Sequence, residues 1–128
     1  MHKSRLSTMF IDCAPEDFER GMHFWSAALG KPIMQTDDER YVTLKGRVGA
    51  AGGIYVGLQR VAAVERAIHV DIETDDVERE VARLQGLGAT VKARIREHVV
   101  MLAPSGHAFC VVKVYRPDFE TGATTWND

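Results

Sequence analysis

One histidine in an alternating run is the residue best placed for chemistry. Residues 67–73 alternate between apolar and polar side chains, which predicts a strand with His69, Asp71 and Glu73 on one face. An imidazole in that position can ligate a metal, move a proton or orient a ligand through hydrogen bonds. The plainer interpretation is a histidine that hydrogen-bonds to a neighbouring side chain, and the sequence leaves both open.

Two aspartates lie at matching places in the two halves of the chain, and each half also contains one cysteine. Asp12 and Asp71 lie near the ends of two apolar strands. Paired carboxylates perform acid–base chemistry only when they are close together, and strand-end hydrogen bonding is the alternative. Cys13 and Cys110 lie inside apolar runs, so we expect buried, reduced thiols.

Two tyrosines, Tyr41 and Tyr55, lie on expected strands. Their rings can stack on a ligand, or they can simply pack in a core or an interface. The glycine-rich stretch 46–53 lacks the Gly-Lys-Ser/Thr ending of a phosphate-binding loop and does not open a helix, so we expect a plain loop between strands.

The composition indicates one ordinary globular domain, 1–128. Apolar residues make up 45% of the chain and the formal net charge is -2, with no basic run typical of nucleic-acid or anionic-membrane binding. The first residues lack the apolar core of a signal peptide, and no apolar run reaches the length of a membrane span. We therefore expect a cytoplasmic protein whose partner is a small molecule or another protein.

The apolar spacing predicts the same order of elements twice. The expected strands are 9–13, 33–35, 40–44, 54–61, 67–73, 89–95, 98–102 and 108–115. A helix with a broad apolar face, including Phe24 and Trp25 as packing residues, is expected between the first two strands and ends at Gly30. A second helix, with Thr74 and Asp75 as N-cap candidates, follows the fifth strand.

The two halves also align residue by residue. Asp12 aligns with Asp71, and the run 17–20 aligns with 76–79 at the same offset. The agreement of offset and element order indicates a doubled supersecondary unit.

Three segments carry a resemblance to a known family: 24–32 (FWSAALGKP), 68–89 (IHVDIETDDVEREVARLQGLGA) and 103–112 (APSGHAFCVV). They resemble the vicinal oxygen chelate (VOC) superfamily, specifically its glyoxalase-like and bleomycin-resistance-like single-domain proteins. The resemblance implies an α+β fold in which two βαβββ modules form a curled mixed sheet around a cavity. The modules would be 6–61 and 66–115, followed by a tail, 116–128, that folds back on the domain or on a partner subunit.

The resemblance also implies where a divalent metal would be held. His69 matches a ligand position on the first strand of the second module. The repeat places Phe10 at the equivalent position, and a phenyl ring cannot ligate a metal. The last strands offer Gln59 and Cys110, of which Cys110 is expected to be structural. We therefore predict no cofactor; if a metal is bound, His69 and Gln59 are its expected ligands.

The leading prediction is a glyoxalase-like protein that binds a small molecule in its cavity without a conventional metal site. The resemblance implies a homodimer, and the expected ligand-binding residues are Phe10, Tyr41, Gln59, His69 and Cys110. The alternatives are a divalent-metal lyase, isomerase or ring-cleaving dioxygenase, and a non-catalytic interaction module.

Overall fold

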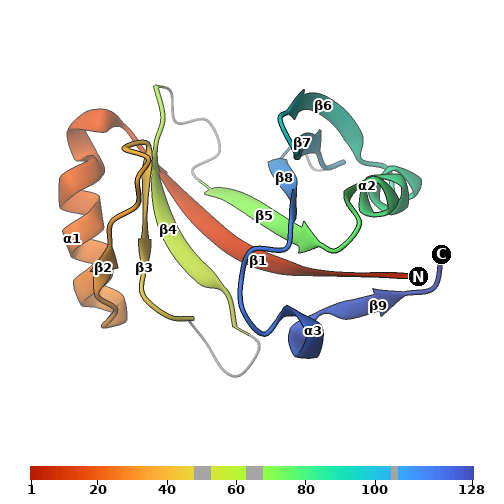
Figure 1. The fold of residues 1–128 in the computed structure, drawn as a ribbon. Coiled ribbons are helices and arrows are strands. Elements are labelled where there is room, and N and C mark those ends of the chain that lie inside the picture. The colour runs from red at the N-terminus through yellow and green to blue at the C-terminus, as the bar shows by residue number, and fades with distance from the viewer. Residues whose placement is uncertain (48–52, 63–67, 105–106) are drawn as a thin grey trace. The chain divides into compact units, whose positions relative to one another are not determined.

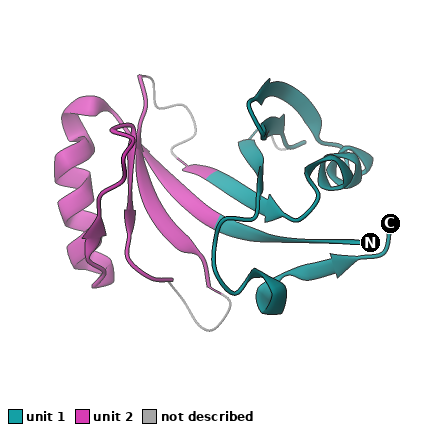
Figure 2. Ribbon diagram, viewed as in Figure 1, with its two compact units in different colours: residues 1–7, 70–128 teal, residues 8–69 magenta. Residues whose placement is uncertain are grey.

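A computed structural model describes residues 1–47, 53–62, 68–104 and 107–128 of the chain. They form two compact units: one is Thr8–His69, and the other combines Met1–Ser7 with Val70–Asp128 (Figure 2). The centre of the expected glycine-rich loop and most of the turn expected at 104–106 lie outside the described residues.

The unit Thr8–His69 contains a helix and a four-stranded mixed sheet. Its strands lie in the order β2-β3-β4-β1, with β1 and β4 parallel and the other pairs antiparallel (Figure 1). The elements are β1 (His2–Cys13), a 3-10 turn (Pro15–Asp17), α1 (Phe18–Leu29), β2 (Ile33–Met34), β3 (Tyr41–Leu44) and β4 (Tyr55–Arg60).

Helix α1 lies between the first two predicted strands and ends where the sequence predicts. Pro15 and two acidic residues form the turn that precedes it, and Gly30 ends it with a left-handed φ of 65°. The helix packs Phe18, with Met22 and Trp25, against buried Val42 and Leu58 of the sheet. The prediction that Phe24 is a packing residue is wrong. Phe24 is 62% exposed, because it lies beside the apolar face of the helix rather than on it.

The second unit has the same order of elements. It contains β5 (Ile68–Thr74), α2 (Val77–Gly86), β6 (Thr90–Ile95), β7 (His98–Leu102), β8 (Ala108–Lys113), α3 (Phe119–Gly122) and β9 (Thr124–Trp126). Strands β5 and β8 are parallel, and β7 joins β8 to β6 in antiparallel pairs. Val81 and Leu84 of α2 pack on buried Met101, Phe109 and Val111.

The predicted strand–helix–strand–strand–strand order, twice over, is therefore confirmed. The repeat extends to strand register: Asp12 pairs with Gln59 in the parallel β1–β4 ladder, and Asp71 pairs with Cys110 in the parallel β5–β8 ladder. Gln59 and Cys110 thus occupy equivalent positions in the two copies.

Two local expectations are wrong. The N-cap of α2 is Asp76, whose side chain accepts a hydrogen bond from the backbone N–H of Arg79. Thr74 instead accepts from the Asp76 N–H and donates to the Lys3 carbonyl. Strand β1 begins at His2, whereas the sequence predicted a strand that begins at residue 9. The prediction missed the first half of β1 because this half buries polar side chains and so lacks the apolar pattern of a strand.

The sequence left open whether the tail, 116–128, returns to the domain or joins a partner subunit. In the structure, β9 pairs antiparallel with the first residues of β1, so the tail returns to its own chain.

Candidate functional site

The two faces of the sheet in Thr8–His69 differ in chemistry. Alternate residues of β1, β3 and β4 point to opposite faces. One face packs against α1, as described above. The register places Asp12 beside Gln59 and Gln59 beside Tyr41, so these side chains belong to the opposite face, together with Phe10. We call Phe10, Asp12, Tyr41, Gln59 and His69 the Phe10 face.

Phe10 lies across a glycine. Gly57 is its direct partner in β4, and a Cβ atom at Gly57 would lie 2.7 Å from the Phe10 ring and 2.7 Å from the Val42 carbonyl oxygen. Only a residue without a side chain leaves this space for the ring. The Phe10 side chain is accordingly buried, with 7% of its surface exposed.

Aromatic rings surround Phe10. The Tyr41 ring meets it edge-on, with centroids 5.7 Å apart and planes at 63°. The His69 imidazole is tilted at 44°, with its centroid 6.5 Å from that of Phe10. Tyr41 and His69 are only partly buried. The rings therefore offer a ligand a partly exposed aromatic wall.

A carboxylate and an amide lie beside these rings. Gln59 Nε2 donates to Asp12 Oδ1 over 3.2 Å. Burial raises the pKa of Asp12 above its ordinary value, and the charge of His69 and the hydrogen bond from Gln59 offset only part of this. The charged form of Asp12 is therefore under-stabilised, and a donor or cation placed beside it would relieve that cost.

A second group of donors is carried by β5 and β8. His69 and Asp71 lie two residues apart on β5, and Cys110 is the direct partner of Asp71 on β8. One ligand atom from each residue lies within 4.8 Å of the others. A nitrogen, an oxygen and a sulfur donor together fit a borderline-soft cation such as zinc, which accepts three protein ligands in catalytic sites.

His69 of this donor group is also a metal ligand expected from the sequence. Gln59, the other expected ligand, donates its amide N–H group to Asp12, which leaves its carbonyl oxygen as the atom that could ligate a metal. Asp71 lies near His69, as the alternation of the strand predicted when it placed both residues on one face. Its role as a possible metal ligand was not predicted, although the alternation held the signal for it.

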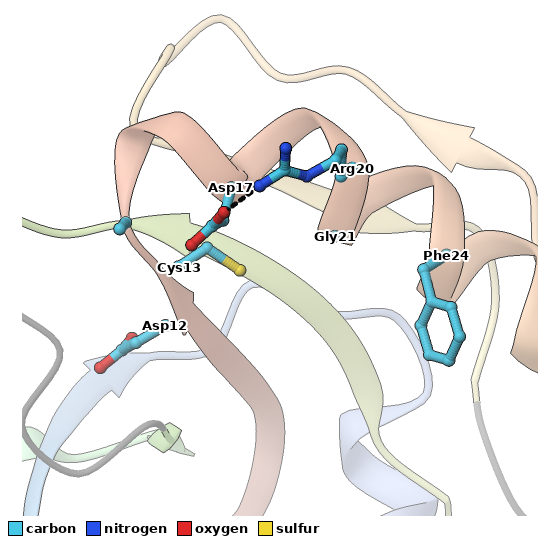
Figure 3. A pocket seen from close by; sticks show the side chains of 7 residues that line it. Asp12, Cys13, Asp17, Arg20, Gly21 and Phe24 are labelled. Atoms are coloured by element: carbon cyan, nitrogen blue, oxygen red, sulfur yellow. Dashed lines mark hydrogen bonds and ion pairs between the residues drawn. The ribbon is translucent and has the colours of Figure 1, made fainter.

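The cysteines are both free and both only half-buried. Cys13 lines a hollow of about 460 Å³ at the end of β1, together with residues of the turn and helix that follow (Figure 3). Burial, with the negative charges of Asp12 and Asp17, raises the pKa of the Cys13 thiol. Cys13 is therefore a poor nucleophile near neutral pH. Exposed Phe24 and the Asp17–Arg20 ion pair complete the hollow.

The chain belongs to the glyoxalase-like domain family, which it matches over residues 8–112. Its place in the wider VOC superfamily agrees with solved structures of the same fold. Comparison with curated protein sequences gives no match.

Three solved structures illustrate the fold. Methylmalonyl-CoA epimerase from Streptomyces coelicolor, in complex with 2-nitronate-propionyl-CoA, is 19% identical with a TM-score of 0.57. The match covers 88% of this chain and 98% of the epimerase chain. A glyoxalase/bleomycin resistance protein/dioxygenase superfamily member from Vibrio splendidus is 17% identical with a TM-score of 0.56, covering 87% and 99%. The 2,3-dioxygenase LapB from Pseudomonas sp. KL28 is 20% identical with a TM-score of 0.58, covering 96% and 46%. At these identities the likeness concerns the fold alone.

Within the described ranges, each helix is too short or too polar to cross a membrane.

Proposed function

We propose that this protein binds a small molecule on the Phe10 face and that binding does not require a metal. The observation that carries the proposal is Phe10 itself, a buried ring at a position where the superfamily resemblance implies a metal ligand. An aromatic wall with a few oriented polar groups is typical of small-molecule sites.

The side chains of the face favour a particular class of ligand. Phe10 and Tyr41 suit a flat apolar group. Asp12 is an acceptor whose charge is incompletely compensated, and Gln59 directs its N–H group to Asp12, which leaves its carbonyl oxygen as a further acceptor. We therefore expect an aromatic or planar molecule that carries an amine or another hydrogen-bond donor.

Benzylamine, benzyl alcohol and benzoate are matched probes for this proposal, because they share a ring and differ in the polar group. We expect benzylamine to bind most tightly and benzoate least, measured by ¹H–¹⁵N chemical-shift titration. Asp12→Asn should weaken benzylamine binding about ten-fold, since a hydrogen bond to a charged group contributes roughly 1.5–3 kcal/mol.

Asp37→Asn is the matched control, because Asp37 is an exposed residue outside the Phe10 face. It should leave the affinity for benzylamine unchanged.

Benzylamine binding should also weaken as the pH falls through the raised pKa of Asp12, because protonation removes the negative charge of Asp12. If folded protein binds none of the three probes, the proposed function is wrong.

A second candidate is a divalent-metal lyase, isomerase or dioxygenase, and the donor group His69, Asp71 and Cys110 favours it. A metal held there would act as a Lewis acid toward a ligand oxygen. His69 would then hold the metal, and the Phe10 face would orient the ligand. Stoichiometric zinc that is lost in His69→Ala and kept in His98→Ala would support this candidate.

We also propose that the chain acts in the cytoplasm as a homodimer, with 6–61 and 66–115 as the two modules of one domain. The superfamily resemblance supports this assembly. Light scattering after size-exclusion chromatography measures the mass, and a monomer would contradict it.

A further inference from the structure

A hollow of about 210 Å³ lies between the start of α2 and the β6–β7 hairpin, and none of its lining residues belongs to the Phe10 face. Val77 and Val99 form the apolar part of its lining. Val99 pairs with buried Val111 on one side and with Arg94 on the other, so these three residues point to the face of the sheet that packs against α2. Helix α2 begins at Val77, and the hollow lies where the helix stops covering this face.

Charged side chains form the rim of the hollow. Arg94 Nη1 lies 2.6 Å from Glu78 Oε1, and Lys113 Nζ lies 2.8 Å from Glu97 Oε1, so each carboxylate has its own cation. Arg96 is a third cation of the rim. Within the described ranges of the chain, its side chain makes no hydrogen bond or ion pair. The rim therefore carries one positive charge that no carboxylate compensates.

The backbone of Arg96 adopts a conformation that arginine rarely takes. Ile95 pairs with His98, so Arg96 and Glu97 form a two-residue loop between β6 and β7 (Figure 1). Arg96 has a positive φ of 56°, which glycine or asparagine adopts at a lower cost in free energy. A hairpin that needed only a turn would be more stable with one of those residues. Arginine at this position is therefore better explained by what its side chain does.

We propose that the hollow binds a small organic carboxylate, which pairs with Arg96 and places its hydrocarbon group on Val77 and Val99. The guanidinium group presents a planar fork of donors that matches a carboxylate. The apolar lining favours an anion that carries a hydrocarbon group over a bare inorganic anion. This site is additional to the Phe10 face, and neither site depends on the other.

The volume of the hollow limits its occupant. Pockets for drug-sized ligands enclose about 300–1,000 Å³, and this hollow is smaller. A short branched chain or a single ring is therefore the largest hydrocarbon group that we expect beside the carboxylate.

Three small probes separate the contribution of charge from that of apolar contact. Isovalerate combines a carboxylate with a branched alkyl group, isoamyl alcohol keeps the alkyl group without the charge, and inorganic phosphate has the charge alone. Each is titrated at low ionic strength, because salt screens exposed charges. Methyl ¹H–¹³C spectra report binding through the signals of Val77 and Val99. Isovalerate should shift both signals to saturation and bind about five-fold or more tightly than either other probe.

Arg96→Asn separates binding from folding. Asparagine tolerates the left-handed conformation, so the urea midpoint of this variant should equal or exceed that of the wild type. Its affinity for isovalerate should nevertheless fall about five-fold, because the pairing cation is gone. Lys92→Asn is the matched control, since Lys92 is an exposed cation of β6 that does not line the hollow. It should bind isovalerate as the wild type does.

Four results would each overturn the proposal. Isovalerate could leave the Val77 and Val99 signals unmoved, or another probe could bind as tightly as isovalerate. Arg96→Asn could keep the wild-type affinity or lose no more than Lys92→Asn does, which would exclude a specific role for Arg96. Arg96→Asn could also lower the urea midpoint, which would show that arginine is retained there for stability. None of these results bears on benzylamine binding at the Phe10 face.

Discussion

Phe10 and Gly57 form a pair in which each residue explains the other. The ring of Phe10 occupies the space that a side chain at Gly57 would need, and the Val42 carbonyl oxygen closes that space from the other side. Phe10 is consequently held against the sheet, where it meets the edge of Tyr41. This fixed ring is what makes one face of an otherwise ordinary sheet suitable for an apolar ligand.

Gly57→Ala should therefore destabilise the protein by about 1–3 kcal/mol, as overpacking in a filled site does. The added methyl group would displace the Phe10 ring and press on the strand next to it. Urea denaturation measures the change. Gly86→Ala is the control, because a Cβ at Gly86 meets nothing within 4 Å, and it should be neutral or slightly stabilising.

At this scale the sequence indicated candidate residues but not their hydrogen-bond partners. The structure brings Phe10, Tyr41, Gln59 and His69 into one unit and places Cys110 on β8 beside Asp71. That Asp12 would hydrogen-bond with Gln59 could not be predicted, because the partner depends on strand register. A register shift of one residue would place Gln59 on the opposite face.

Elements were predicted well where apolar periodicity was strong and poorly where polar residues are buried. Helices α1 and α2 and the three strands that follow each of them match the apolar spacing, whereas α3 was not predicted. The first half of β1 buries His2, Ser4 and Ser7, whose partners lie far along the chain, so no local pattern marks it as a strand. Strand β9 escaped notice for the same reason, since it exists only by pairing with that half of β1.

Helix α2 offers a test of an element boundary. Asp76→Ala should cost about 1 kcal/mol, because the N–H of Arg79 loses its capping acceptor. Asp76→Ser retains an N-cap oxygen and should recover most of the loss. Urea denaturation of the three proteins measures both changes. Equal stabilities for the alanine variant and the wild type would show that the cap contributes nothing.

On the scale of the whole molecule, the aromatic wall and the donor group favour different functions. The chain belongs to the glyoxalase-like domain family, and the resemblance to the VOC superfamily implies metal ligands on the first and last strands of each module. In this chain β1 and β4 offer Phe10 and Gln59, whereas His69 of β5 has Asp71 and Cys110 as neighbours. The aromatic wall favours binding without a metal, and the donor group on β5 and β8 favours a metal.

Ligand binding after metal removal separates these functions most directly. Benzylamine is titrated into protein that has been treated with a chelator and dialysed, and again after zinc is added back, with ¹H–¹⁵N spectra as the readout. The proposed function predicts the same affinity in both states, with shifts at Phe10, Asp12, Tyr41 and Gln59. Binding that disappears with the metal and returns with zinc would contradict it and establish the metal-dependent alternative.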